Sequence, residues 1–159
     1  MIPACPRGDR RGEEGFTLLE VVCVLAIFAT IAAVVIPALP RGTSRARLES
    51  YAIATAAVLK VDRDAAIRQG TQVATRVDAA SRLISSGATD RIVQIPDDVT
   101  VDALLAAQCR HEPTRSTIRF FASGMSCGGA ISLTRLGFGY EVRVNWLTGR
   151  VDIVAINPA

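Results

Sequence analysis

A long uncharged segment near the N-terminus constrains this chain more than any other feature. No charged residue occurs from Val21 to Pro40, and the stretch from Phe16 to Leu39 is apolar apart from a few small or polar residues. As a helix, about 24 residues extend roughly 36 Å, which is enough to cross a hydrocarbon core of about 30 Å. The segment therefore predicts a transmembrane helix over residues 16–39.

A cleavable secretory signal peptide is the alternative for this segment. The apolar region of such a peptide is only about 7–15 residues long and is closed by a small-residue site of the A-x-A type. No such site closes the segment here, because the first small-residue patterns, at residues 52–56, come only after several charged residues. We therefore expect the segment to be retained as an anchor.

The charges that flank the segment do not determine its orientation. Arginines precede and follow it in equal number, whereas an excess on one side would mark the cytoplasmic end. They are Arg7, Arg10 and Arg11 before the segment and Arg41, Arg45 and Arg47 after it. The topology must come from another feature.

A single carboxylate, Glu20, lies just inside the segment, and Gly15 directly precedes the segment. A charge at the bilayer centre costs about 2.5–3.5 kcal/mol on insertion scales, and intramembrane ionisable groups normally have a partner. Glu20 is about one helical turn from Phe16. If the chain were cut before Phe16, the new cationic amine of Phe16, in the same or a neighbouring subunit, would supply that partner, and pairing with a neighbour would also set the stagger between subunits.

These residues form the sequence Gly15-Phe16-Thr17-Leu18-Leu19-Glu20, which resembles the processing site of type IV prepilins and type II secretion pseudopilins. The resemblance implies a leader peptide over residues 1–15. It also implies that a prepilin peptidase cuts between Gly15 and Phe16 at the cytoplasmic face and methylates the new amine of Phe16. The implied location is the inner membrane, with a single pass, a cytoplasmic N-terminus and a periplasmic C-terminal head.

Pro37 lies near the end of the segment and matches a proline that this family carries at the equivalent depth. A proline in a helix removes one hydrogen bond and kinks or breaks the helix. The resemblance gives Pro37 a role in the membrane helix and its assembly. Termination of the helix beside Pro40 is the alternative.

The helix is expected to continue beyond the segment, over residues 40–69, and strands are expected after it. The apolar stripe of the helix consists of Leu48, Ala52, Thr55, Leu59 and Ala66. Thr43 or Ser44 could cap or continue this helix, which ends near Gly70. If it continues, residues 16–69 form one long rod, with residues 40–69 packed on the head.

After Gly70 the sequence is rich in β-branched residues that largely alternate with polar ones, which predicts strands. The expected strands are residues 71–77, 91–95, 117–121, 130–134, 140–147 and 150–156. Thr148-Gly149 predicts a tight hairpin turn, and the connections at 81–90 and 96–115 are expected to be loops with short helices or strand pieces. The predicted fold class is α+β and pilin-like: a long N-terminal helix packed against an antiparallel sheet in a head of residues 70–159.

The last part of the chain resembles the C-terminal pattern of H-type minor pseudopilins (GspH) of the type II secretion system, a family that also includes FimT-like minor pilins. The matching residues are Phe120, Gly124, Gly128, Gly129, Ile131, Leu133 and the stretch 142–153. The resemblance implies a structural subunit near the tip of a pseudopilus. Its implied partners are the prepilin peptidase, the other minor pseudopilins, the major pseudopilin and the inner-membrane assembly platform.

A FimT-like minor pilin that takes part in pilus assembly or captures DNA is the alternative. Affinity for DNA comes mainly from clustered Lys and Arg. Here the net charge is only +3, no Lys or Arg follows Arg150, and no cluster of five or more like charges occurs. We therefore do not expect nucleic acid to be a partner.

Two of the four cysteines, Cys109 and Cys127, lie in the expected head. Outside the cytoplasm they could form one disulfide that closes a loop of about 20 residues and contributes about 3 kcal/mol. Two free thiols are the alternative. A third use, zinc binding together with His111, is disfavoured because a C-x-H spacing with a distant cysteine is not a usual structural pattern.

Residues 124–128 fit the G-x-S-x-G motif of α/β-hydrolases. That motif needs a strand before it, a helix after it and a histidine as base. Here strands are expected on both sides, and His111 has no clear orienting acid, so a glycine-rich turn is the better interpretation. We expect no enzymatic activity, no cofactor and no metal.

Tyr140 and Trp146 fall six residues apart on one face of the expected strand at 140–147. Packing in the core is the first expectation for both rings. A contact with another subunit is the alternative.

Overall fold

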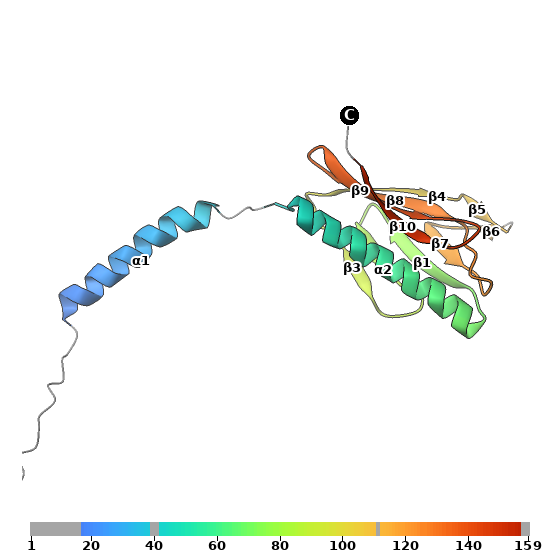
Figure 1. Cartoon of the computed structure of the whole chain (residues 1–159), viewed down its shortest axis with the longest axis horizontal. Helices are drawn as coiled ribbons and strands as arrows, with labels where there is room; N and C mark the ends of the chain where they lie inside the picture. The colour runs from blue at the N-terminus through green and yellow to red at the C-terminus, as the bar shows by residue number, and fades with distance from the viewer. Residues whose placement is uncertain (1–16, 39–41, 111, 157–159) are drawn as a thin grey trace, which may run out of the picture. The chain divides into compact units, whose positions relative to one another are not determined.

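The computed structural model describes residues 17–38, 42–110 and 112–156. The chain divides into two compact units, Met1–Pro40 and Arg41–Ala159 (Figure 1). In the first unit the described structure is a single helix, α1 (Leu18–Ala38). The second unit, called the head below, contains α2 (Arg45–Gln69) and strands β1 to β10.

The strands of the head form two four-stranded antiparallel sheets and a two-stranded ribbon. The first sheet has the order β3 (Ile92–Gln94), β2 (Leu83–Ser85), β1 (Val73–Asp78), β7 (Thr117–Phe120). The second has the order β10 (Val151–Ile156), β9 (Phe138–Val144), β8 (Gly129–Arg135), β4 (Thr100–Leu105), and the ribbon pairs β5 (Gln108–Cys109) with β6 (Glu112–Pro113). The predicted α+β class is confirmed, with the strands divided between two sheets instead of one.

Both ends of α2 have the caps that its sequence favours. The Ser44 hydroxyl accepts a hydrogen bond from the backbone N–H of Arg47 at 3.3 Å, and Gly70 ends the helix with a φ of 65°. Ser44 thus caps the helix and does not continue it. Because residues 42–44 are not helical, the prediction of one uninterrupted helix over residues 16–69 is wrong.

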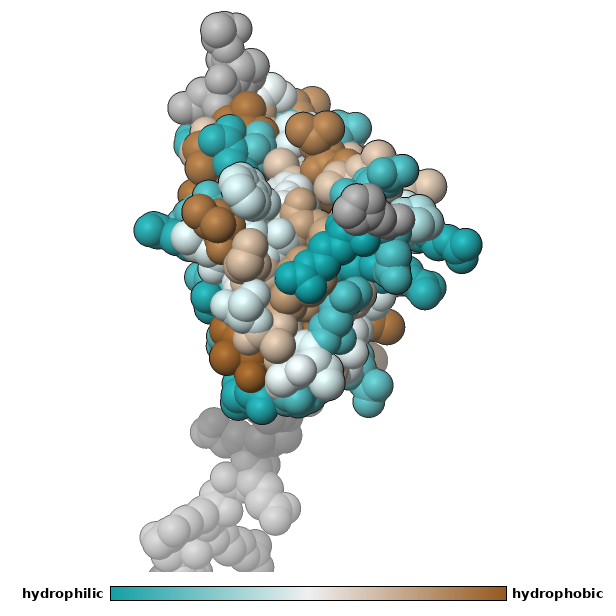
Figure 2. Space-filling model, turned by 90° about the vertical axis from the view of Figure 1, so that its right-hand side faces the viewer, coloured by the Kyte–Doolittle hydropathy of each residue, from teal (hydrophilic) through white to brown (hydrophobic). Residues whose placement is uncertain are grey.

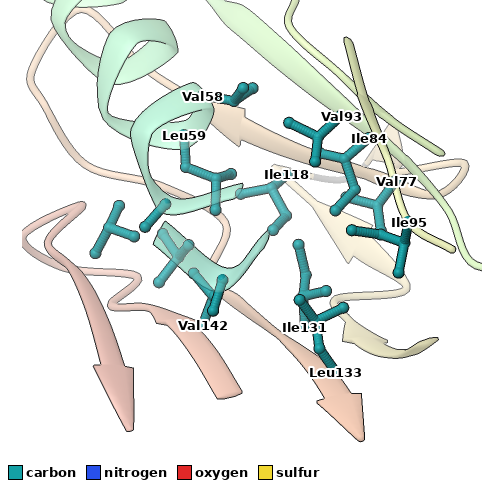
Figure 3. Packing of buried hydrophobic residues seen from close by; sticks show 14 of the residues in the cluster. Val58, Leu59, Val77, Ile84, Val93, Ile95, Ile118, Ile131, Leu133 and Val142 are labelled. Carbon is teal, nitrogen blue, oxygen red and sulfur yellow. The ribbon is translucent and has the colours of Figure 1, made fainter. Parts of the chain in front are cut away.

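The core of the head lies between α2 and the inner faces of both sheets. The predicted helical stripe is confirmed, since Leu48, Ala52, Thr55, Leu59 and Ala66 are all buried. Figure 3 shows the side chains of Leu59 from α2, Ile118 from β7 and Val142 from β9 directed into the same interior. Full burial of a Leu, Ile or Val side chain stabilises by about 1.5–3 kcal/mol, so these contacts hold the helix and the two sheets together as one unit.

A buried carboxyl group adds a polar connection to this core. Asp62 of α2 is fully buried, and its oxygens accept hydrogen bonds from the hydroxyls of Thr75 (2.5 Å) and Ser86. They also accept from the backbone N–H groups of Gly87 (3.0 Å) and Ala88 (3.1 Å). Asp62 therefore ties α2 to β1 and to the loop that joins β2 and β3.

Two strands of the sheets fall in segments that were expected to be loops. β4 pairs with β8 from Thr100 opposite Thr134 to Leu105 opposite Gly129, yet only one of its residues, Val101, is buried. Apolar residues such as Leu104 also occupy the exposed face, so apolar and polar residues do not alternate clearly in this sequence, and that alternation is the signal by which a strand is predicted. β2 is three residues long, which is too short to show a period.

The β9–β10 hairpin is confirmed, but its turn is wider than the expected pair Thr148-Gly149. The strands are joined by residues 145–150, in which the N–H of Asn145 donates to the carbonyl of Arg150 at 2.9 Å. The side-chain oxygen of Asn145 also accepts from two of the following backbone N–H groups. Gly149 has a φ of 63°, and a Cβ there would lie 2.1 Å from the carbonyl oxygen of Gly124 in a neighbouring turn.

Candidate assembly and interaction site

The predicted cleavage and methylation site, Gly15 and Phe16, lies outside the described residues. The described chain begins at Thr17 and α1 begins at Leu18. Cleavage after Gly15 and methylation of Phe16 stay predictions from the sequence. The structure does describe Glu20 and the start of the helix that carries it.

Glu20 is the third residue of α1 and is exposed. The hydroxyl oxygen of Thr17 accepts a hydrogen bond from the backbone N–H of Glu20 at 3.2 Å, and the carbonyl of Thr17 accepts from Val21 at 3.3 Å. A threonine followed three residues later by glutamate is the capping-box pattern, and a carboxylate is favourable near a helix N-terminus. Thr17 thus caps the start of α1, and Glu20 occupies the position at which a carboxylate suits the helix N-terminus, a local feature not predicted from the sequence.

Pro37 is the next-to-last residue of α1, which ends at Ala38. A helix end this close to the proline agrees with helix termination, the alternative that was left open for Pro37.

No helix within residues 17–38, 42–110 and 112–156 has the length and apolar character needed to cross a membrane.

The start of the head is held by a three-residue network that the sequence analysis missed. The carboxylate of Asp98 accepts hydrogen bonds from the backbone N–H (2.7 Å) and the hydroxyl (2.8 Å) of Thr43, which is buried. Arg135 places Nε 2.9 Å from the same carboxylate and donates to the carbonyl of Thr43 at 2.6 Å. Because Thr43 directly precedes the cap of α2, this network fixes the point at which the chain enters the head.

The network predicts a pH dependence of stability. The hydrogen bonds from Thr43, and then the charge of Arg135, lower the pKa of Asp98 below its usual value. A carboxylate with a lowered folded pKa stabilises above its unfolded pKa of about 3.9, and this contribution is lost as the pH falls through the folded pKa. We expect Asp98→Asn to lower the melting temperature at pH 7, and the difference from the unsubstituted chain to shrink below about pH 4.

The matched control for this measurement is Asp97→Asn. Asp97 is the preceding residue, has a side chain that is 90% exposed and forms a surface ion pair with Arg82. Melting followed by circular dichroism over a pH series should show little change for this variant. An equal loss in both variants, or a loss for Asp98→Asn that does not depend on pH, would contradict the role assigned to the network.

Cys109 and Cys127 form a disulfide, the pairing that the sequence had left open. Their Cα atoms are 5.7 Å apart, and the bond links β5 to the segment before β8. Because both sulfurs are bonded to each other, neither is available to zinc as a thiolate. His111, the third residue considered for a metal, lies outside the described residues.

We expect loss of this disulfide to lower the free energy of unfolding by about 3 kcal/mol, since the bond closes a loop with a sequence separation of 18 residues. Chemical denaturation of the double variant Cys109→Ser, Cys127→Ser would measure the loss. Reductant should destabilise the unsubstituted chain and leave the double variant unchanged. Cys23→Ser, which alters the exposed cysteine of α1, is the control and should keep the response to reductant.

The G-x-S-x-G segment forms a turn between two strands, as expected. β7 ends before it and β8 begins after it, and the N–H of Gly124 donates to the carbonyl of Phe121 at 2.8 Å. Ser126 is buried, and its hydroxyl accepts from the backbone N–H of Gly128 at 3.1 Å. The strand–turn–helix context of a nucleophile elbow is therefore not formed by these residues.

The two rings assigned to one strand face occupy different environments. Tyr140 is buried in β9, and its hydroxyl donates to Glu49 of α2 at 3.2 Å, so the prediction of core packing is confirmed for it. The prediction is wrong for Trp146, which lies beyond the end of β9 in the turn and is 61% exposed. Because its ring is exposed, subunit contact stays the open alternative for Trp146. Figure 2 shows that one face of the molecule carries small groups of hydrophobic residues among hydrophilic ones.

Comparison with known proteins defines the class of this chain. Residues 10–36 match the prokaryotic N-terminal methylation motif. The fold is similar to that of the minor pseudopilin EpsH from the type 2 secretion system of Vibrio cholerae, with a TM-score of 0.54 at 15% identity over 68% of this chain and 96% of that one. It is also similar to the type IV minor pilin FimU of Pseudomonas aeruginosa, with a TM-score of 0.53 at 16% identity over 70% of this chain and 91% of that one. The fold and the N-terminal motif are therefore those of a pilin-like protein.

A sequence relative gives the family. The chain is 33% identical over 142 residues to type II secretion system protein H of Xanthomonas campestris, covering 89% of this chain and 83% of that protein. The chain belongs to the type II secretion system protein H family. The H-type resemblance drawn from both ends of the sequence is confirmed.

Proposed function

We propose that the protein is a minor pseudopilin, a structural subunit in the tip region of the pseudopilus of a type II secretion system, which exports folded proteins across the outer membrane. The observation that carries this proposal is the 33% identity to type II secretion system protein H over most of both chains. The methylation motif at residues 10–36 supports the same assignment. The proposed role is structural, with no catalytic step.

The type IV minor pilin is the second candidate, and the fold alone does not separate the two. The TM-score is 0.54 to EpsH and 0.53 to FimU, so the two folds are equally similar to this one. The relative that matches most of the sequence is a secretion-system protein, and this favours the pseudopilin. The low net charge of +3 gives no support to DNA capture.

The N-terminal segment supplies the proposed mechanism of assembly. Residues 1–15 are the leader, and the prepilin peptidase removes it and methylates Phe16. Residues 16–39 anchor the chain in the inner membrane, with the N-terminus cytoplasmic and the head periplasmic. The exposed side chains of α1 support the proposal that this helix lies in an apolar environment, because large apolar residues are distributed around the whole helix. They are Leu18, Leu19, Val21, Val22, Val24, Leu25, Ile27, Phe28 and Ile31.

In this mechanism Glu20 sets the stagger between this subunit and its neighbour in the pseudopilus. Its carboxylate pairs with the cationic amine of Phe16 on a neighbouring subunit, because an unpaired charge in the membrane is costly. The partners of the assembled protein are the other minor pseudopilins, the major pseudopilin and the inner-membrane assembly platform. Growth of the pseudopilus from this platform moves cargo toward the outer membrane.

The experiment that tests this proposal is the intact mass and N-terminal sequence of the protein expressed with and without a prepilin peptidase. We expect a chain that begins at Phe16 and carries one added methyl group only when the peptidase is present. Gly15→Leu should block the cut, whereas Gly12→Ala, a change at another leader glycine, should not. An uncut chain, or a cut at a later small residue, would overturn the proposed pathway.

A further inference from the structure

A cleft of about 570 Å³ lies between α2 and the start of β10 in the head. Its lining residues are Lys60, Arg63 and Asp64 from the helix and Thr148, Gly149, Arg150, Val151 and Asp152 from the hairpin. Successive residues of a strand point to opposite faces of its sheet, yet the cleft touches both Val151 and Asp152. The cleft therefore lies along the edge of β10 and not over one face of the sheet.

The edge of β10 is open to a further strand. In the described part of the chain β10 is the outer strand of its sheet and pairs with β9. Asn145 and Arg150 lie opposite each other where the two strands meet the turn, and the N–H of Asn145 donates to the carbonyl of Arg150, so these two residues form a hydrogen-bonded pair of the ladder. Because hydrogen-bonded and non-hydrogen-bonded pairs alternate along an antiparallel ladder, Val151, Ile153 and Ala155 direct their N–H and C=O groups away from β9.

Nothing in the sequence of β10 protects this edge strongly. Its six residues include one charged side chain, Asp152, and no proline or lysine. Ile153 and Val154 are 37% and 38% exposed on the two faces of the strand. An exposed apolar edge of this kind is a template for pairing with another chain unless a partner covers it.

The charges of the cleft indicate what kind of partner fits. Arg63 lies 3.8 Å from Asp64, and Arg150 lies 2.8 Å from Asp152. Arg63 also donates to the carbonyl oxygen of Thr148 at 3.1 Å, which holds the helix to the hairpin. Lys60 is exposed and has no ion-pair partner within residues 17–38, 42–110 and 112–156. The cleft thus has an excess of positive charge, centred on an available ammonium group.

We propose that this cleft binds an extended segment of a neighbouring pseudopilin subunit, which adds to β10 as a further strand and places a carboxylate beside Lys60. The inference rests on the proposed function, because it takes the partner from the same pseudopilus. Backbone hydrogen bonds to Val151, Ile153 and Ala155 supply sequence-independent affinity, as in other cases of strand addition. The carboxylate supplies selection and register.

The test uses the full chain, purified in detergent, and an array of short overlapping peptides that cover the other pseudopilin subunits of the same secretion system. Each peptide that contains Asp or Glu is paired with its Asn or Gln copy. We expect binding by a peptide of strand-forming sequence that weakens at least about tenfold when its acid is replaced by the amide. Lys60→Gln should cause a similar loss, and Lys60→Arg should retain binding.

A second pair of variants tests the strand edge. Ala155→Pro removes an outward N–H at an edge position that tolerates proline, and it should weaken binding at least about tenfold. Ala155→Ser keeps the N–H and should bind normally. Amide exchange at Val151, Ile153 and Ala155 should slow when the peptide is bound, and circular dichroism should show that the variants are folded.

Three results would overturn the inference. In the first, no peptide binds the protein. In the second, a peptide binds but neither Lys60→Gln nor Ala155→Pro weakens its binding. In the third, duplex DNA binds at Lys60 and no peptide does. A chain that is cut and methylated at Phe16 but binds no peptide would reject only this inference. A chain that is not cut would reject the proposed assembly pathway whatever the peptides do.

Discussion

Glu20→Gln will leave the protein in the membrane fraction and remove it from assembled pseudopili, with a loss of incorporation of at least about tenfold. The substitution removes the negative charge that we assign to pairing with the amine of Phe16. The attraction between two opposite charges in the membrane is lost when one of them is neutralised. Shearing pseudopili from cells and probing the sheared and membrane fractions for the protein measures the effect.

The structure makes a control necessary, because Glu20 also belongs to the cap of α1. Glutamine is accepted at this capping-box position, so Glu20→Gln changes the charge with little change to the cap. Thr17→Ala does the reverse, since it removes the hydroxyl that accepts from the N–H of Glu20 and keeps the carboxylate. We expect Thr17→Ala to assemble nearly normally. Assembly lost in Thr17→Ala and retained in Glu20→Gln would assign Glu20 to helix capping alone.

Asp62→Ala will lower the free energy of unfolding of the head by about 4 kcal/mol. The change leaves two buried hydroxyls and two backbone N–H groups without their acceptor, and hydrogen bonds to a charged group contribute about 1.5–3 kcal/mol each before the structure relaxes. Chemical denaturation of the full chain in detergent, followed by circular dichroism, measures the loss.

Asp64→Ala is the matched control for Asp62→Ala, because it changes the same residue type half a turn away on α2. The Asp64 side chain is 56% exposed and lies 3.8 Å from Arg63, so its removal should change stability by less than about 0.5 kcal/mol. Asp62→Asn retains one acceptor oxygen and should fall between the two. Equal stability of the Asp62→Ala and Asp64→Ala variants would show that the buried hydrogen bonds of Asp62 contribute nothing.

Local sequence patterns predicted the parts of the head whose physics is local. The buried stripe of α2 follows from the helical period, and Gly70 ends the helix because it adopts a left-handed φ without steric cost. Strands with clear alternation, such as β1 and β9, were found for the same reason. β2 and β4 were missed because three residues show no period and because exposed apolar residues on β4 hide its inner face.

From the sequence alone came the family resemblance, the prediction of a cleavage site between Gly15 and Phe16, the position of Glu20 and the two cysteines able to pair. Which groups meet across long separations along the chain depends on the tertiary structure. Thr43 and Asp98 are 55 residues apart, and Asp62 finds its hydroxyl partners 13 and 24 residues away. The same holds for the cleft between α2 and β10. A periodic pattern indicates which face of a helix or strand is buried, whereas the partner that a residue meets depends on how the two sheets and the helix pack together.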